Sequence, residues 1–175
     1  PDFASPVAIV IAVYFFAFQI YCDFSGYSDI AIGAARVLGF DLMENFRRAY
    51  LATSVPEFWG HKRWHISLSN WFRDYMYFPM GGSRVSKPRF YFNQMAVFLV
   101  SGLWHGANWT FVIWGGLNGL YQVLTVATDG LRAKLGHTFR IPAVIGSVLG
   151  GLVTFHLVLI AWVFFRAASV SDALT

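Results

Sequence analysis

The chain has 175 residues, of which 57% are hydrophobic and 13% are charged. Soluble domains carry about 45–50% apolar and about 25% charged residues, so one soluble core of this length could not bury these side chains. The composition therefore indicates an integral membrane protein. The net charge of +4 would also suit a nucleic-acid-binding protein, but the basic residues lie in loops between apolar runs, as in inner-membrane proteins. The single cysteine, Cys22, excludes an internal disulfide.

Residues 3–22 are almost wholly apolar and predict the first transmembrane span. The chain starts with proline and has no basic n-region, so we expect an internal section of a longer protein rather than a signal peptide. A polar cluster from Asp23 to Asp29 should end this span, with Asp23 or Ser25 capping the next helix. The same carboxylates could instead line a water-filled entrance. Residues 30–40 are too short for a second span and predict a tilted or half-buried helix.

Residues 41–89 combine basic and aromatic side chains. Eight of the thirteen Lys and Arg residues fall in this stretch, interleaved with Trp, Tyr and Phe. Such side chains favour the headgroup level of a bilayer, which predicts one or two interfacial helices. Pro56 suits a first helical turn, with Thr53 or Ser54 as its cap. We expect the helical structure to stop at Pro79, before a Gly-Gly-Ser turn.

Residues 90–127 contain no carboxylate, Lys or Arg. A straight helix of this length would be roughly 57 Å long, against a bilayer core of about 30 Å. The run is therefore either one long helix that projects from the membrane or two helices broken near His105. Two helices would place the basic loops 44–89 and 129–140 on one side, as the positive-inside rule prefers. Residues 141–165 predict a further span, with glycines spaced for helix packing.

His105 is the only side chain in residues 90–127 that titrates near neutral pH. Burying an ionisable group in a membrane is costly, and a neutral imidazole suits a general base. On a continuous helix, Ser101, Asn108 and Trp109 would share its face and could orient the ring or hold a substrate. A histidine hydrogen-bonded between packed helices explains the pattern equally well, so spacing alone leaves both interpretations open.

His65 is the second candidate. Helical spacing would place Ser69 and then Arg73 on its face, with Asp74 beside them. Taken by itself, this pattern favours the solvated face of an amphipathic helix over a binding site. His156 stands alone in the last span and predicts a helix contact, while His61 and His137 should be solvated in basic loops.

Two stretches resemble the signature sequences of the membrane-bound O-acyltransferases. The first runs from Glu57 to Gly82 and contains Arg63-Trp64-His65-Ile66-Ser67-Leu68-Ser69-Asn70-Trp71-Phe72-Arg73-Asp74-Tyr75. The second, Ser101-Gly102-Leu103-Trp104-His105-Gly106-Ala107-Asn108-Trp109, resembles the active-site helix of the family. Residues 22–29 and 162–167 are similar to the branch that acetylates alginate and other exopolysaccharides.

The resemblance implies an all-α, polytopic integral membrane protein, with helices around a funnel that narrows at a catalytic histidine. His105 falls on the family's invariant histidine, and His65 on its second functional position. Family members are several hundred residues long, so we expect this chain to be truncated at both ends. The family pattern places two residues between Phe-Trp and Trp-His, whereas four follow Trp59 here, which could bulge the chain or shift His65 by half a turn.

The predicted reaction moves an acyl group, acetyl in the first instance, from a cytoplasmic thioester such as acetyl-CoA to hydroxyls of an extracellular or periplasmic polysaccharide. Periplasmic or extracellular acetylation proteins are the expected partners, and the bacterial inner membrane is the expected location. No metal and no bound cofactor are predicted. His105 and His65 are the predicted catalytic residues: His105 either deprotonates the acceptor hydroxyl or relays the acyl group itself, and His65 also positions substrate. The predicted substrate-binding residues are Asn108, Ser69 and Asp74, together with Arg63 and Arg73 for the phosphates or acidic groups of the donor, and Trp104 and Trp109 for a tunnel that excludes water.

Three other functions fit parts of the pattern. A transporter or proton pathway could use His105 as a relay, although residues 90–127 hold none of the carboxylates that such a path would need. A haem protein could use His105 and His156 as axial ligands. A non-catalytic scaffold of a polysaccharide export complex would make His105 structural.

Overall fold

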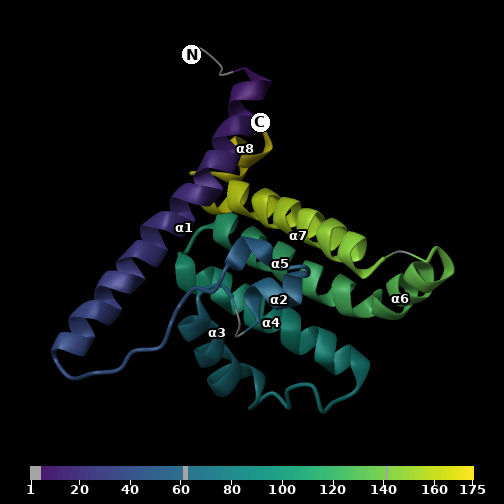
Figure 1. Cartoon of the computed structure of the whole chain (residues 1–175), viewed down its shortest axis with the longest axis horizontal. Helices are drawn as coiled ribbons and strands as arrows, with labels where there is room; N and C mark the ends of the chain where they lie inside the picture. The colour runs from purple at the N-terminus through teal and green to yellow at the C-terminus, as the bar shows by residue number, and fades with distance from the viewer. Residues whose placement is uncertain (1–4, 61–62, 141) are drawn as a thin grey trace.

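The computed structural model describes residues 5–60, 63–140 and 142–175, and in these ranges every regular element is helical (Figure 1). The elements follow in chain order: α1 (Pro6–Val37), η1 (Ala49–Leu51), α2 (Val55–Trp59), α3 (Ile66–Phe72), η2 (Arg73–Tyr77), α4 (Lys87–His105), α5 (Trp109–Ala127), α6 (Asp129–Thr138), α7 (Ala143–Arg166) and α8 (Val170–Leu174). Helices α4, α5 and α7 run side by side, and α1 crosses α7 at a steep angle (Figure 1).

Helix α1 is one continuous helix of 32 residues, so the predicted end of the first helix at the polar cluster is wrong. Ser5 caps its start by accepting a hydrogen bond from the Ala8 amide, and Asp23 and Ser25 lie inside the helix rather than at a cap. The polar cluster is accommodated because Ser28 is buried and receives a hydrogen bond from Asn45 of the following loop. The helix ends at Leu38, before Gly39 with its left-handed backbone.

Two helices of the described residues, α1 and α7, are long and apolar enough to cross a membrane. They meet where the Tyr14 hydroxyl lies 2.7 Å from Nε2 of His156, whose Nδ1 lies 2.7 Å from the Leu152 carbonyl oxygen. A carbonyl oxygen only accepts, so a neutral His156 donates from Nδ1 and accepts the tyrosine hydroxyl at Nε2. The predicted helix contact of His156 is confirmed.

Residues 90–127 form two antiparallel helices, α4 and α5, joined at residues 106–108. Their backbones approach closely because glycines face each other: a Cβ on Gly102 would meet the Phe111 carbonyl oxygen, and one on Gly115 would meet that of Phe98. Gly119 lies against Met95 and Phe98 in the same contact. The hairpin presents the end of α4, with His105, to the rest of the fold.

The chain between α1 and α4, called the irregular segment below, contains the short helices η1, α2, α3 and η2 and packs against this hairpin through α2 and η2. Ser54 caps α2 by accepting from the Glu57 amide, as its sequence predicts, and helical structure ends near Pro79 before Gly81 and Gly82, which have positive φ. Trp64 from this segment packs with Trp162 of α7, with ring centroids 5.2 Å apart. The core therefore joins the irregular segment to α5 and α7 through large aromatic rings, chiefly Phe58, Trp64, Trp114 and Trp162.

Two details near the ends of helices differ from the expectations. Residues 129–138 form an exposed helix, α6, rather than a loop; Asp129 lies in its first turn, where a carboxylate is favourable, and residues 131–135 are good helix formers. In α7, Gly150 packs against the carbonyl oxygen of Thr53 rather than against another helix. The predicted span 141–165 begins at a residue outside the described ranges, as does the span 3–22, so only their remaining parts are seen.

Candidate active site

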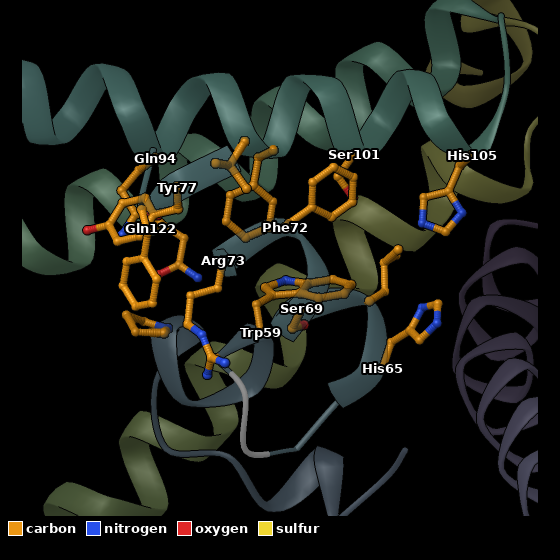
Figure 2. Close-up of a pocket in the computed structure, with 16 residues that line it drawn as sticks. Trp59, His65, Ser69, Phe72, Arg73, Tyr77, Gln94, Ser101, His105 and Gln122 are labelled. Atoms are coloured by element: carbon orange, nitrogen blue, oxygen red, sulfur yellow. The ribbon is translucent and has the colours of Figure 1, made fainter. Parts of the chain in front are cut away.

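A cavity of about 340 Å³ lies between the α4–α5 hairpin and the segment from α2 to η2. His65 and His105 stand at one end of it, and Arg73, Tyr77, Gln94 and Gln122 at the other (Figure 2). Trp59 lies between these ends. Each wall comes from a different part of the chain, so the cavity exists only when the irregular segment docks against the hairpin.

His105 is the last residue of α4, and its imidazole sits among aromatic rings of three helices. Its ring centroid lies 4.9 Å from Trp104, 5.0 Å from Trp114 and 5.1 Å from Phe165. Gly106, with its extended backbone, ends the helix directly after it, and a Cβ there would collide with the Phe111 ring. This packing fixes the ring without a polar contact from the described residues, so both of its nitrogens remain available to a ligand.

His65 precedes α3 and has a left-handed backbone, with φ of 44°. That conformation is uncommon for a residue with a Cβ and persists only where the surroundings impose it. Asn45 does so: its backbone oxygen accepts from the Ile66 amide, and its side-chain oxygen accepts from the amide and hydroxyl of Ser67. The His65 ring then packs edge-on against Phe24 of α1, 4.7 Å away.

A second cavity, of about 750 Å³, lies on the other side of the two histidines. Residues of α1, the ends of α4 and α7, and both imidazoles line it. His65 and His105 are thus the shared boundary of two cavities. A molecule in either cavity can therefore reach both imidazoles.

Burial and, to a smaller extent, the neighbouring His105 together lower the pKa of His65 to about 4. His65 is therefore neutral at physiological pH, with one ring N–H donor and one acceptor. At the far end of the first cavity, the hydrogen bond and charge of Arg73 lower the pKa of Asp74, which stays ionised. The Arg73 side chain is only partly exposed and lines the cavity, while its Nε and one terminal nitrogen donate to Asp74.

The structure brings together only part of the predicted site. His65, Ser69, Arg73 and His105 line the first cavity, and Trp104 lines the second. Asp74 reaches the site only through its ion pair with Arg73.

Three predicted residues lie elsewhere. The Arg63 guanidinium pairs with Glu57 and donates to the Arg48 carbonyl oxygen, and it does not line the first cavity. Asn108 caps α5 and donates to the Ala168 carbonyl oxygen. Trp109 follows the break between α4 and α5 and is 73% exposed. It does not share the face of His105, because the helix is not continuous there.

Several residues of the site were not predicted. Trp59 forms a wall of the first cavity, and its indole N–H donates to the fully buried side chain of Asn118, 2.7 Å away. Gln94 and Gln122 bring amides to the same cavity. Asn118 and Gln122 could have been predicted, because a polar residue inside an apolar helix needs a buried hydrogen-bond partner or a ligand. No sequence pattern indicated Asn45, because its role depends on contacts with residues that are remote in the chain.

Two remaining expectations concern other histidines. Both ring nitrogens of His156 are engaged by Tyr14 and Leu152, which leaves no nitrogen for a haem iron. His137 is exposed on α6, as expected. His61 and Lys62, two of the four residues after Trp59, lie outside the described residues; His65 nevertheless lies across the cavity from His105 (Figure 2).

Comparison with known proteins gives one consistent result. Residues 3–168 match the model of the membrane-bound O-acyltransferase family. The chain is 46% identical over 155 residues to a probable alginate O-acetylase of Pseudomonas aeruginosa, which covers 89% of the chain and 28% of the relative. It is 43% identical over 159 residues to a peptidoglycan O-acetyltransferase of Helicobacter pylori, which covers 91% of the chain and 29% of the relative.

A more distant similarity extends the range of relatives. A teichoic acid D-alanyltransferase of Bacillus subtilis is 28% identical over 159 residues, covering 85% of the chain and 38% of the relative. The chain thus spans less than two fifths of the length of each of these relatives. The family match covers nearly all of it, and the chain belongs to the membrane-bound O-acyltransferase family.

Proposed function

We propose that the protein containing this chain transfers an acetyl group from a cytoplasmic thioester to a hydroxyl of an extracellular or periplasmic polysaccharide. The observation that carries the proposal is that His65 and His105 form the boundary between two cavities. Such an arrangement admits a donor from one side and an acceptor from the other without a shared entrance. The names of the relatives, which include two O-acetyltransferases of cell-surface polymers, support the reaction class.

The first cavity suits the donor. It adjoins the basic segment 63–89, and Arg73 faces it at the end remote from the histidines (Figure 2). An arginine there can meet the phosphate groups of a donor such as acetyl-CoA. The middle of the cavity is lined by Trp59, Phe72 and Phe98, and such apolar walls suit the arm of the donor and exclude the water that would hydrolyse a thioester. By the positive-inside rule the basic segment faces the cytoplasm, where the donor is expected.

The second cavity suits the acceptor, because it is wider and reaches both histidines from the opposite side. In the transfer, an acceptor hydroxyl gives its proton to His105 as its oxygen bonds to the thioester carbonyl carbon. The carbon–sulfur bond then breaks, and the thiolate leaves with the proton that His105 releases. A neutral His65 can donate its ring N–H to the carbonyl oxygen, where negative charge develops.

The decisive experiment measures polymer O-acetylation in cells carrying the full-length protein with His105→Ala. We expect acetyl ester to disappear while the protein level in the membrane fraction stays normal. His137→Ala, which removes an exposed histidine of α6, is the matched control and should leave acetylation unchanged. Acetylation that survives His105→Ala at normal level would remove this residue from the chemistry and favour a non-catalytic scaffold. Proton flux in vesicles without an acyl donor would favour a transporter.

A further inference from the structure

The first cavity follows one face of α4. The residues of this helix that line it recur every three or four positions, which is the spacing of a single helical face: Gln94, Val97, Phe98, Ser101 and His105. The separation of Gln94 from His105 in the sequence corresponds to roughly 16 Å along the helix axis. A ligand whose reacting atoms lie at His105 must therefore be long and extended to meet Gln94.

Gln122 of α5 lies at the same level of the hairpin as Gln94. Gly119 of α5 packs against Met95 of α4. Because the two helices are antiparallel, Gln122, one turn further along α5, lies beside the turn of α4 that holds Gln94. Figure 2 shows the two glutamines and Tyr77 gathered at the end of the cavity away from the histidines.

Gln122 differs from the other buried amide of α5 in having no partner for its carboxamide among the described residues. It is 5% exposed and lines the first cavity. Asn118, one turn earlier, accepts from the Trp59 indole and donates to the Trp114 carbonyl oxygen. A buried amide without hydrogen bonds is destabilising, so its presence at a cavity indicates a group that supplies them.

The groups at this end of the cavity suit an uncharged chain that carries amides. A glutamine carboxamide both donates and accepts hydrogen bonds, as does a tyrosine hydroxyl. The arm between the thioester and the first phosphate of acetyl-CoA contains two amides and a hydroxyl. This arm is comparable in length to about four extended residues, or roughly 14 Å. A thioester carbon at His105 would thus bring the far half of the arm, with its second amide, to the two glutamines.

We propose that Gln94 and Gln122 determine which thioesters the protein accepts, by binding the second amide of the donor arm. Gln122 accepts a hydrogen bond from the amide N–H, and Gln94 donates one to the amide carbonyl oxygen. This role rests on the proposed function, which places the donor in the first cavity. Recognition of the donor then depends on uncharged groups of its arm as well as on the phosphate near Arg73.

The test measures binding, so that its result does not depend on catalysis. The purified full-length protein in lipid nanodiscs is titrated by calorimetry with two unreactive thioethers. One is S-ethyl coenzyme A, and the other is the same compound with oxygen in place of the N–H of the second amide. We expect the wild type to bind the first about tenfold more tightly, which is the effect of one hydrogen bond at a buried site. Gln122→Leu should bind the two compounds equally, because only the first loses a hydrogen bond.

Two further variants separate this contact from general damage to the cavity. Gln94→Leu should weaken both compounds by the same factor, since both keep the carbonyl oxygen. Gln19→Leu removes a carboxamide that does not line the first cavity and should change neither Kd. Melting temperatures check that each variant is folded.

Three results would overturn the role of the glutamines: a wild type that binds neither compound, a wild type that binds both alike, or a Gln122→Leu variant that keeps the preference. Acetyl transfer from acetyl-CoA to a polysaccharide is assayed on the same wild-type preparation. Transfer without the binding preference would leave the proposed function intact and remove the glutamines from donor recognition. A binding preference without transfer would overturn the proposed function and leave the amide-binding site in place.

Discussion

The two histidines of the site are held by different kinds of structure. His105 ends a regular helix whose position is set by glycine contacts between α4 and α5 and by surrounding aromatic rings. His65 lies on an irregular segment, in a left-handed conformation imposed by hydrogen bonds that Ile66 and Ser67 donate to Asn45. The first histidine depends on close packing that spreads over a whole hairpin, and the second depends on a few polar contacts at one point.

This difference separates stability from activity. A change in the hairpin should disturb the whole fold, because α4 and α5 form the most extensive helix contact and α5 places Trp114 in the aromatic core. A change at Asn45 should leave the fold largely intact and move one ring of the site. Substitutions in the two regions can therefore test whether the two histidines are held independently.

The largest effect is expected from Gly115→Val. A side chain at this position would meet the backbone oxygen of Phe98, which cannot move away without shifting α4. Overpacking of this kind typically costs about 1–3 kcal/mol, and the backbone obstacle places it at the upper end of that range or beyond. Thermal unfolding of the purified full-length protein measures it. Gly116→Val is the matched control, since a side chain there meets only Leu99 at 3.7 Å; equal melting temperatures for the two variants would contradict the proposed role of the glycine contact.

The second effect is expected from Asn45→Ala, which removes the acceptor for Ser67 and the donor to Ser28. Lost hydrogen bonds at a partly buried site cost about 1–3 kcal/mol. Because the lost contacts hold His65, kcat should fall by about tenfold or more while the KM for acetyl-CoA changes little. Asn45→Asp keeps an oxygen acceptor for Ser67 and should restore part of kcat. A melting temperature that falls equally in both variants, with kcat unchanged, would make Asn45 merely structural.

The third effect is a dependence of stability on pH. The folded protein holds the pKa of His65 at about 4, below the ordinary value of 6.5. Between these values the unfolded chain binds a proton at this residue and the folded chain does not, so the contribution of His65 to stability falls as pH drops from about 6.5 toward 4. Melting temperatures of the wild type and His65→Gln across this range measure the contribution. The variant should have a flatter profile; parallel profiles would mean that His65 is solvated.

The smallest effect is expected from Glu44→Gln. Glu44 and Arg47 form an ion pair in the irregular segment close to Asn45, but both side chains are 64% exposed. Exposed pairs contribute about 0.5 kcal/mol or less. Neither kcat nor the melting temperature should change measurably. This result would show that the hydrogen bonds of Asn45, and not the charges of its loop, hold His65. A loss of activity as large as that of Asn45→Ala would show that the whole loop, rather than one side chain, holds His65.

Sequence patterns predicted the regular parts of this molecule well. The apolar run of α7, the Ser54 cap and the break near His105 all follow from local rules that act over a few residues. The continuity of α1 does not, because Asp23 and Ser25 are typical cap residues, whereas in the helix Ser25 donates to the Cys22 carbonyl oxygen and Ser28 accepts from Asn45. Helix α6 was missed since an exposed polar helix has no apolar stripe.

The residues of the site also divide into those that local patterns predict and those that depend on the folded structure. His105 stood out because it is the one titratable group in a long apolar run, and the resemblance to the family selected it and His65. Arg63, Asn108 and Trp109 belong to the same motifs but serve the fold or lie outside the two cavities. A motif indicates which residues share a region, but not which of them face the same space. That depends on backbone conformations such as the left-handed His65, which no periodic pattern contains.

The length of α1 has a consequence for the lipid around it. Its 32 residues are about 48 Å long, whereas the hydrocarbon core of a bilayer is about 30 Å thick. A helix longer than the core tilts in the bilayer or projects beyond it into the headgroup region. Because Asp23 follows the apolar residues of this helix and lines the same cavity as the histidines, the projecting part would bring that cavity to the depth of the headgroups. The tilt of α1 would then determine the depth at which a polar acceptor meets the two rings.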